Sequence, residues 1–311
     1  MLSVGFIGFG EAGSALARGL RSAGVERIFA YDIKLDDPLV RGRARESQAT
    51  IVESSSDLAE AATILFSTVT SSSALDAARQ TVAYLAPRHT YADLNSVSPA
   101  LKQEVEKVVS ATGASFVEAA VMAPVGPYGH KVPMLLGGAG AQAFADLMRP
   151  FGMRLDVLDG AKVGSAAAVK MCRSIVVKGI EALLFECVMA ATKFDADALV
   201  FASLKETWPG VDWAKLADYT SGRVVVHGER RAREMDEVAE TLRVIGIDPI
   251  MAEATARRQD WSAEMDLRAH FGPEGPATYR EVVDVIEKLR VTSPGSSRTS
   301  AARKSSRPTR R

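Results

Sequence analysis

The sequence has few residues that could build a metal centre or a disulfide framework, and it has no long apolar run. Its 311 residues include two cysteines and four scattered histidines, too few and too dispersed for a zinc site. No apolar stretch approaches the ~20 residues that a membrane-spanning helix needs. The chain begins without the basic segment and cleavage site of a secretory signal. These absences predict a cytoplasmic protein without a bound metal.

The two cysteines, Cys172 and Cys187, fall within one apparent helix. At about 1.5 Å of rise per residue they lie roughly 22 Å apart, which is too far for a disulfide. We therefore expect both thiols to be reduced.

Charge is balanced over the whole chain but uneven at its end. Because 38 basic residues match 38 acidic ones, nothing global attracts nucleic acid or an anionic membrane, and neither is expected as a partner. Residues 292–311 carry Lys and Arg but no acid. Such a segment buries too little surface to fold, so it predicts a disordered basic tail. A solvated tail is preferred over a nucleic-acid-binding arm.

Strand-like apolar runs alternate with helical segments in the first half of the chain. The runs lie at 4–7, 28–31, 63–68, 90–95, 116–122, 133–136 and 154–158. The helical segments lie at 12–22, 74–84, 99–111 and 141–148. This alternation predicts an α/β domain over residues 1–160, with a doubly wound parallel sheet of the Rossmann type.

The rest of the chain has the pattern of helices. A long segment, 163–193, is apolar nearly all round, as in a helix buried in a domain centre or a subunit interface. Further helices are predicted at 197–207, 213–220, 225–245, 248–259 and 279–289. We predict an all-α domain over residues 161–291 for substrate binding and homodimerisation. The substrate would lie at the junction of the two domains.

A glycine-rich turn follows the first apolar run directly. Gly8, Gly10 and Gly13 have the spacing G-x-G-x-x-G before a helical segment. In dinucleotide-binding folds these glycines permit a tight turn, a close approach of backbone to pyrophosphate, and close packing of the helix. The helix N-terminus presents free N–H groups to the phosphates. An ordinary strand–helix turn is the alternative. The predicted cofactor-binding residues of the turn are Gly8, Phe9, Gly10, Glu11, Ala12 and Gly13.

The second apolar run ends in Tyr31 and Asp32, which are also predicted to bind the cofactor. An acid at this position accepts hydrogen bonds from the adenosine ribose of NAD and repels the 2′-phosphate of NADP. Lys34 and three arginines that follow it could offset the repulsion if their loop folds back. We predict NAD as the cofactor, with NADP left open.

A nicotinamide oxidoreductase needs a group that takes or gives the hydroxyl proton of its substrate. The sequence has neither a Tyr-x-x-x-Lys pair nor a zinc ligand set. Lys170 is the one lysine of an otherwise apolar stretch, where desolvation would lower its pKa toward the working pH. A lysine that extends its amine from the helix into solvent fits these residues equally well.

Four motifs follow one another along the chain: the glycine turn, Asp93–Pro99, Glu118–Pro124 with a glycine pair downstream, and Gly164 with Lys170. In this order they resemble the β-hydroxyacid dehydrogenases, a superfamily that includes 3-hydroxyisobutyrate and 6-phosphogluconate dehydrogenases. The resemblance covers most of residues 1–290. The segment 227–237 is similar to a phosphogluconate-dehydrogenase-like subgroup with its own C-terminal domain.

The resemblance implies roles for individual residues. Lys170 matches the catalytic lysine of the superfamily, and Asn95 and Ser96 match residues near the nicotinamide ribose. The residues that follow the strand lining the cofactor cleft are Thr68, Val69 and Thr70.

Two departures from the superfamily concern the substrate. Met122 and Ala123, followed by a proline, stand where many members have Ser-Gly-Gly for the substrate carboxylate. Ser174 stands where an Asn follows the catalytic lysine. Both changes remove polar groups that hold a small hydroxyacid, so a bulkier or less polar substrate is predicted at these three residues.

A polar segment in the C-terminal half supplies further candidates. On a helix, His227, Arg230, Arg231 and Glu234 lie on one face, at i, i+3, i+4 and i+7. Arg suits a carboxylate or phosphate, so the four residues are predicted to clamp an anionic or polar substrate. A solvated, salt-bridged face is the alternative. The resemblance favours the clamp because it places this segment near the cleft.

Together these features predict an NAD(P)-dependent oxidoreductase with Lys170 as its general acid and base. It would transfer a hydride between the cofactor and a hydroxyl or carbonyl group of a hydroxyacid-like small molecule. If the substrate is a β-hydroxyacid, oxidation with or without decarboxylation stays open. Two alternatives stay open: an imine reductase on the same scaffold, against which Lys170 argues, and a nicotinamide-binding sensor without turnover.

Overall fold

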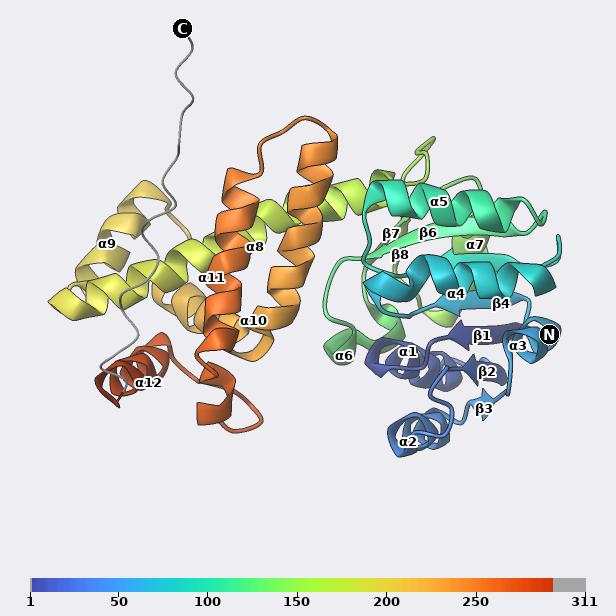
Figure 1. The fold of residues 1–311 in the computed structure, drawn as a ribbon, viewed down its shortest axis with the longest axis horizontal. Helices are drawn as coiled ribbons and strands as arrows, with labels where there is room; N and C mark the ends of the chain where they lie inside the picture. Colours follow the sequence, from blue (N-terminus) through green and yellow to red (C-terminus); the bar gives the residue numbers. More distant parts are fainter. Residues whose placement is uncertain (1, 293–311) are drawn as a thin grey trace, which may run out of the picture. The chain divides into compact units, whose positions relative to one another are not determined.

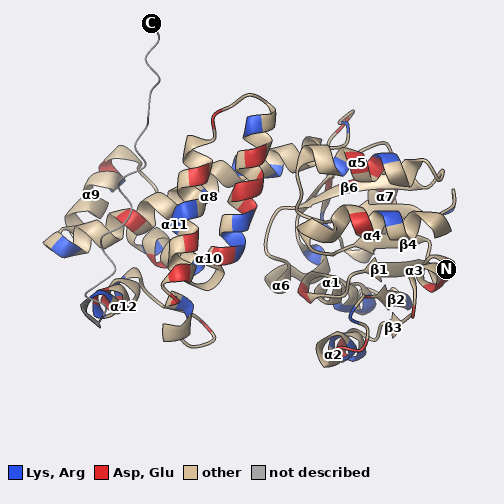
Figure 2. Cartoon of the chain, in the orientation of Figure 1, with Lys and Arg blue, Asp and Glu red and all other residues tan. Residues whose placement is uncertain are grey.

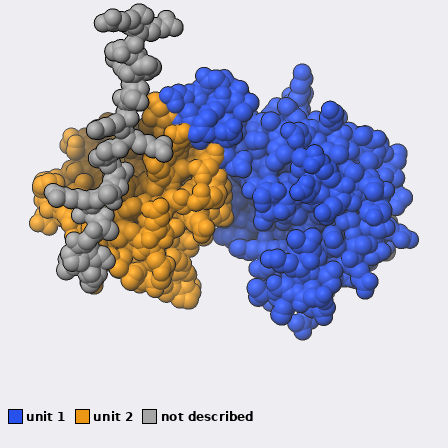
Figure 3. Space-filling view, viewed as in Figure 1, with its two compact units in different colours: residues 1–176, 237–249 blue, residues 177–236, 250–311 orange. Residues whose placement is uncertain are grey.

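The structure is a computed structural model that describes residues 2–292, and these residues form two compact units (Figure 3). Unit 1 contains the described residues of 1–176 and 237–249, and unit 2 those of 177–236 and 250–311. From residue 293 on, the predicted basic tail lies outside the described residues. The predicted domain boundaries at residues 160 and 291 stay predictions.

Unit 1 is built on one sheet, which within residues 2–292 has eight strands in the order β3-β2-β1-β4-β5-β6-β7-β8 (Figure 1). The strands are β1 Ser3–Ile7, β2 Arg27–Tyr31, β3 Thr50–Ile51, β4 Ile64–Ser67, β5 Thr90–Asp93, β6 Ser115–Val121, β7 Met134–Gly137 and β8 Leu155–Val157. Strands β1 to β6 have the order of a Rossmann sheet. From β1 the chain first adds strands on one side, as β2 and β3, and then on the other side, beginning with β4, so the strand order reverses between β1 and β4. The predicted fold class is confirmed.

Helices cover both faces of this sheet, because alternate strand residues enter two separate cores. The helices of unit 1 are α1 Glu11–Ser22, α2 Pro38–Ser47, α3 Ser55–Ala61, α4 Ala74–Thr81, α5 Pro99–Ser110, α6 Val125–Tyr128, α7 Ala141–Met148, the start of α8 Ser165–Ala191 and the end of α10 Trp213–Val244. One core joins Phe6 and Phe66 to α1, α2 and α7. The other joins Leu65 and Tyr91 to α3, α4 and α5. Alternation with a period of two residues thus produces the doubly wound architecture.

The elements α2, α3, α6 and β3 lie outside the predicted ones. Local start signals are present, since Asp37 caps α2 through the amide of Leu39 and Ser54 caps α3 through the amide of Asp57. However, α2 buries few of its side chains, so its apolar periodicity is weak. Capping alone did not distinguish these short helices from loops.

Within residues 2–292, the predicted parallel sheet has one antiparallel pair, because β7 runs antiparallel to β6. Glu118 pairs with Gly137 and Val121 with Met134. The connection over 122–133 holds only the four-residue α6 and a 3-10 turn, whereas a parallel crossover normally uses a full helix. β7 and β8 are parallel again because α7 connects them.

The described residues of unit 2 form helices joined by loops, without a strand. It contains the rest of α8, with α9 Asp197–Thr207, most of α10 Trp213–Val244, α11 Ile250–Glu264 and α12 Tyr279–Thr292. Phe185 of α8 and Val224 of α10 share one core with α12, and Val188 and Ala217 share a second.

α10 is one helix, although two helices, 213–220 and 225–245, were expected from its sequence. Ser221-Gly222 resembles a break, but Ser221 is fully buried and the helix continues through it. Tertiary packing therefore offsets the cost of a glycine inside a helix, about 1 kcal/mol relative to alanine.

α8 carries both cysteines, and neither is in a disulfide, as predicted. Across residues 2–292, none of the helices has the length and apolar character needed to cross a membrane.

Two glycines of α10 allow a matched test of its packing. A Cβ on Gly228 would lie 2.6 Å from the backbone oxygen of Gln259, whereas one on Gly222 would lie 3.6 Å from that of Pro276. We expect Gly228→Ala to lower the free energy of unfolding by about 1–3 kcal/mol through overpacking. Gly222→Ala should be neutral or stabilising by up to about 1 kcal/mol. Urea unfolding measures both, and equal stabilities would contradict the expected close contact of α10 with α11.

Candidate active site

The turn between β1 and α1 depends on Gly8 and Gly13 for its shape. Gly8 has φ +81°, and a Cβ there would lie 2.7 Å from Val69 Cγ1. A Cβ on Gly13 would lie 2.7 Å from Thr68 Oγ1 and 2.9 Å from the oxygen of Gly8. A side chain at either position would therefore push the turn away from the end of β4.

Gly10 is different, because packing within the protein does not require a glycine there. A Cβ on Gly10 would meet none of the described atoms within 4 Å. Gly10 is also the N-cap of α1, and no side chain of the described region caps this helix. Open space beside uncapped helix amides fits a pyrophosphate.

Thr68 joins this turn to the end of β4. Its hydroxyl donates to the oxygen of Gly8 at 2.7 Å, and its amide donates to the oxygen of Ile7 at 2.8 Å. Val69 follows beside Gly8, and the exposed Thr70 bonds through its hydroxyl with Ser73. Thr68 and Val69 thus contact the glycine turn, at the point where the strand order reverses.

Asp32 lies against the same turn. Its Oδ2 accepts the amide of Phe9 at 2.7 Å, and its Oδ1 accepts the amide of Lys34 at 2.9 Å. The carbonyl of Tyr31 accepts the amide of Gly8 at 2.8 Å. The structure therefore brings the predicted acid to the glycine turn.

Two of the three arginines that could offset the charge of Asp32, Arg41 and Arg45, are exposed and have partners of their own. Arg41 forms an ion pair with Asp36 and donates to the oxygen of Leu35 at 3.2 Å. Arg45 donates to the oxygen of Arg41 at 3.4 Å.

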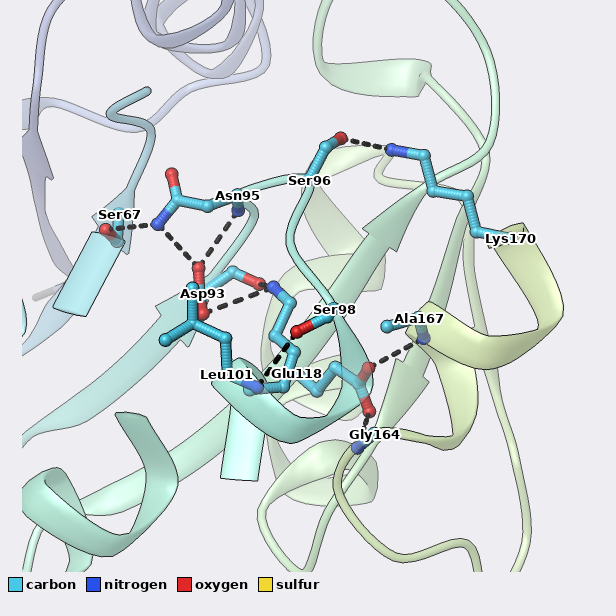
Figure 4. A network of polar contacts seen from close by, with 11 residues as sticks. Ser67, Asp93, Asn95, Ser96, Ser98, Leu101, Glu118, Gly164, Ala167 and Lys170 are labelled. Atoms are coloured by element: carbon cyan, nitrogen blue, oxygen red, sulfur yellow. Dashed lines mark hydrogen bonds and ion pairs between the residues drawn. The ribbon is translucent and has the colours of Figure 1, made fainter. Parts of the chain in front are cut away.

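A buried polar network lies at the end of β5 (Figure 4). Asp93 is 0% exposed, and its Oδ1 accepts both the amide and the side-chain Nδ2 of Asn95, at 2.9 and 2.6 Å. Asn95 Nδ2 also donates to Ser67 Oγ at 2.8 Å. Lys102, 1% exposed, donates to the oxygen of Asp93 at 2.8 Å and lies 3.2 Å from its Oδ2.

This network fixes the side-chain amide of Asn95. Because Nδ2 donates twice, Oδ1 of Asn95 is left as an acceptor, and it is buried without a hydrogen-bond partner among residues 2–292. An acceptor in that position fits a ligand hydroxyl. Burial, and then the charge of Asp93, raise the pKa of Tyr91 far above its usual range, so this phenol stays neutral beside the network.

A second buried carboxylate, Glu118, holds the start of α8 (Figure 4). Its Oε2 accepts the amide of Gly164 and its Oε1 the amide of Ala167, both at 2.7 Å. Asp93 and Glu118 are register partners on β5 and β6. Asp93, Lys102 and Glu118 were not among the predicted site residues. A charged residue within an apolar strand was the available signal, because buried charges are normally paired.

Lys170 lies on the first turns of α8 and is half-buried. Its Nζ donates to the hydroxyl of Ser96 (Figure 4). The structure thus brings together two residues that are 74 positions apart in the sequence. Ser174 follows Lys170 by four residues on the same helix, and both Ser174 and Met122 are half-buried.

The predicted clamp residues of α10 have unequal surroundings in unit 2. Arg231 is 4% exposed and forms an ion pair with the buried Glu181 of α8. Glu234 pairs with Arg230 and lies 2.9 Å from Nζ of Lys178. Acidic and basic residues follow one another along α10 and α11 (Figure 2).

Only part of that predicted helix face is open to solvent. His227 and Arg230 are exposed, whereas Arg231 is enclosed. Burial lowers the pKa of Arg231 and the pKa of Lys178, although each has an acidic partner that acts in the opposite direction. The clamp stays a prediction, and His227 and Arg230 are its accessible members.

Residues 2–292 contain no group of three or more His, Cys, Asp and Glu side chains that could hold a metal ion.

Two family models match the chain. Residues 3–147 match the NAD binding domain of 6-phosphogluconate dehydrogenase, and residues 191–262 match a domain of unknown function, DUF1932. The first match supports a nicotinamide cofactor without distinguishing NAD from NADP.

Relatives extend these matches over most of the chain. An uncharacterized 28.5 kDa protein of Methanothermus fervidus is 30% identical over 264 residues, which are 82% of this chain and 96% of the relative. The mitochondrial 3-hydroxyisobutyrate dehydrogenase of Drosophila melanogaster is 26% identical over 217 residues, 68% of this chain and 65% of that enzyme.

Solved structures agree with these relatives. A conserved hypothetical protein of Sinorhizobium meliloti is 34% identical with a TM-score of 0.75, over 93% of this chain and 97% of that one. A conserved protein of unknown function, described as structurally similar to 3-hydroxyacid dehydrogenases, is 32% identical with a TM-score of 0.71. The match covers 86% of this chain and 99% of that protein. The 3-hydroxyisobutyrate dehydrogenase of Mycobacterium tuberculosis, at 15% identity and a TM-score of 0.70, shares the fold.

The matches to relatives and to solved structures thus agree with the geometry of the glycine turn and with the order of the four motifs. The chain belongs to the β-hydroxyacid dehydrogenase superfamily, in the subgroup that joins the NAD-binding domain of 6-phosphogluconate dehydrogenase to a DUF1932 domain.

Proposed function

We propose that the protein is an NAD-dependent oxidoreductase that acts on a hydroxyl or carbonyl group of a hydroxyacid-like small molecule. The contact between the amine of Lys170 and the hydroxyl of Ser96 carries this proposal. It joins the predicted proton carrier to the loop that the resemblance assigns to the nicotinamide ribose. The bound nicotinamide would supply hydride transfer.

Three parts of unit 1 would hold the cofactor. The uncapped amides of α1 beside Gly10 would bind the pyrophosphate. The carboxylate of Asp32 would accept the adenosine ribose hydroxyls, and Oδ1 of Asn95 would accept a hydroxyl of the nicotinamide ribose. Each group is placed by contacts within the protein, so little ordering is left for binding.

Lys170 would carry the proton. In the direction of oxidation, a neutral Nζ takes the proton of the substrate hydroxyl, and in the direction of reduction the ammonium returns it to the carbonyl oxygen. Ser96 accepts a hydrogen bond from Nζ and thereby orients the amine. A positioned amine next to a cofactor loop is what general acid–base chemistry requires.

The substrate would differ from the small hydroxyacids of the superfamily. Met122, Ala123 and Ser174 offer fewer polar groups than Ser-Gly-Gly and Asn, so less of the binding energy would come from hydrogen bonds to a carboxylate. His227 and Arg230, the exposed members of the α10 segment, are the proposed contacts for an acidic group. The apolar side chains at 122 and 123 favour a bulkier carbon skeleton.

A homodimer is also proposed, with the long helix α8 at its interface. Val176, Ile180 and Leu183 recur along α8 with helical spacing and are 60%, 40% and 60% exposed. An exposed apolar stripe of this kind favours a partner helix. The cytoplasmic location stays a prediction.

The cofactor preference is tested by Asp32→Ala. We expect the wild-type protein to bind NAD more tightly than NADP, and the variant to narrow the gap by about tenfold or more. The reason is that a hydrogen bond to a charged group contributes about 1.5–3 kcal/mol. Titration calorimetry with both cofactors measures the effect. Glu60→Ala removes an exposed carboxylate of α3 instead, and it should leave the preference unchanged. Tighter binding of NADP to the wild type would overturn the preference.

The substrate prediction is tested with 3-hydroxyisobutyrate. Because the polar residues that hold a small hydroxyacid are replaced, we expect kcat/KM for this compound to fall below about 10⁴ M⁻¹s⁻¹, the lower end for enzymes on their own substrates. Reduction of NAD followed by absorbance measures it, in a panel with larger hydroxyacids and cyclic imines. A higher value for 3-hydroxyisobutyrate would refute the prediction, and turnover of cyclic imines alone would indicate an imine reductase.

The role of Lys170 is tested by Lys170→Met, which keeps the apolar stem and removes the proton carrier. We expect the chemical step in single-turnover kinetics to slow by about 10²–10⁴-fold. Cofactor affinity should stay the same, since the glycine turn and Asp32 are untouched. Lys107→Met, at an exposed position of α5, is the control. A normal rate in Lys170→Met would remove Lys170 from the chemistry, and cofactor binding without turnover of any substrate would indicate a sensor.

A further inference from the structure

Glu118 is a carboxylate enclosed in the middle of β6. It is 0% exposed, and its strand neighbours on either side are buried as well. A charge in this position costs several kcal/mol unless hydrogen bonds compensate for it. The compensation comes from Gly164 and Ala167, whose amides donate to the two carboxylate oxygens at 2.7 Å each.

These two amides belong to the first turn of α8. Ser165 is the first residue of the helix, so Gly164 and Ala167 are among the N-terminal amides that have no partner within the helix. A negative charge at a helix N-terminus is also favourable for the helix dipole. Glu118 therefore acts as a two-point cap that comes from a strand 46 residues earlier in the sequence.

The cap lies directly before the residue proposed to carry the proton. Lys170 follows Ala167 by three residues, which is less than one helical turn. A shift or fraying of the first turn would move the amine away from Ser96, its partner in the loop after β5. On the neighbouring strand Asp93, the register partner of Glu118, holds Asn95 next to Ser96.

The glycine that faces Glu118 leaves room for its carboxylate. A Cβ on Gly137 of β7 would lie 2.8 Å from Glu118 Oε2, so an alanine there would push the carboxylate away from the amide of Gly164. Gly137 thus gives a second way to disturb the cap, without changing the charge of Glu118.

We propose that Glu118 is the positioning residue for Lys170: its carboxylate fixes the first turn of α8 so that the amine meets Ser96. This rests on the proposed function for its catalytic consequence. The geometric part, that Glu118 controls the environment of the Lys170 amine, is independent of any substrate.

The test uses Glu118→Gln and Gly137→Ala in the full chain. The glutamine keeps the shape of the side chain but replaces one acceptor oxygen with a donor, so one of the two hydrogen bonds is lost. Glu106→Gln is the matched control, because Glu106 is a neighbouring carboxylate whose pKa is raised by burial and then by Glu118. Gly137→Ala decides the question if Glu118→Gln does not fold.

Two readouts need no substrate. Hydrogen exchange of a peptide spanning 163–170 should speed up about 10- to 100-fold, as expected for the loss of a charge-assisted hydrogen bond. An amine-acylating reagent applied from pH 7 to 11 labels Lys170 and, as a reference, the exposed Lys107. In the variants, the rate of Lys170 labelling and the pH at which labelling is half-maximal should both change, whereas those of Lys107 should not. Exchange in the peptide that covers β1 should stay unchanged, and so should NAD affinity.

The outcomes separate positioning from a purely structural role. Faster exchange at 163–170 together with altered Lys170 labelling supports the proposal, and a kcat reduced more than KM is then expected with any substrate that is found. Faster exchange at 163–170 with unchanged Lys170 labelling would show that Glu118 only caps the helix, and this result overturns the proposal. Unchanged exchange at 163–170 overturns the proposal as well. If the wild type transfers no hydride at all, the proposed function fails, while the labelling result still decides the role of Glu118.

Discussion

Two carboxylates buried side by side on neighbouring strands are the constraint on which the candidate site depends. Asp93 and Glu118 occupy matching positions on β5 and β6, and neither is exposed. Lys102 compensates for one charge, and the amides at the start of α8 compensate for the other. The two carboxylates therefore hold different segments. Asp93 bonds to Asn95 in the loop after β5, and Glu118 bonds to the first turn of α8, the helix that carries Lys170.

The glycine turn and the buried network, the two parts of the proposed cofactor site, are held in place by different physical interactions. At the turn, steric contacts with Thr68 and Val69 decide the backbone path, and the space at Gly10 stays open. At the network, hydrogen bonds decide which way the amide of Asn95 faces. Backbone amides suit the charge of a phosphate, whereas an oriented side-chain oxygen suits a single hydroxyl.

In unit 2, buried and half-buried charged side chains pair with one another between helices. Glu181 of α8 is 2% exposed and forms ion pairs with Arg231 and Arg223 of α10, so the middle of unit 2 is held by ionic contacts as well as by apolar packing. An isolated charge at any of these positions would be costly. The ion pair between Arg231 and Glu181 explains how part of the polar face of α10 can be buried, whereas His227 and Arg230 of the predicted clamp are exposed.

The sequence by itself determined the features that depend on residues close together in the chain. The spacing of Gly8, Gly10 and Gly13, the acid at the end of β2 and the alternation of apolar runs all reflect local geometry. They were enough to predict the Rossmann sheet and the glycine turn that follows its first strand. Only the tertiary structure decided the antiparallel direction of β7, the continuity of α10 and the contact of Lys170 with Ser96. Those features depend on how segments that are distant in the sequence pack against one another, and the local patterns did not decide that packing.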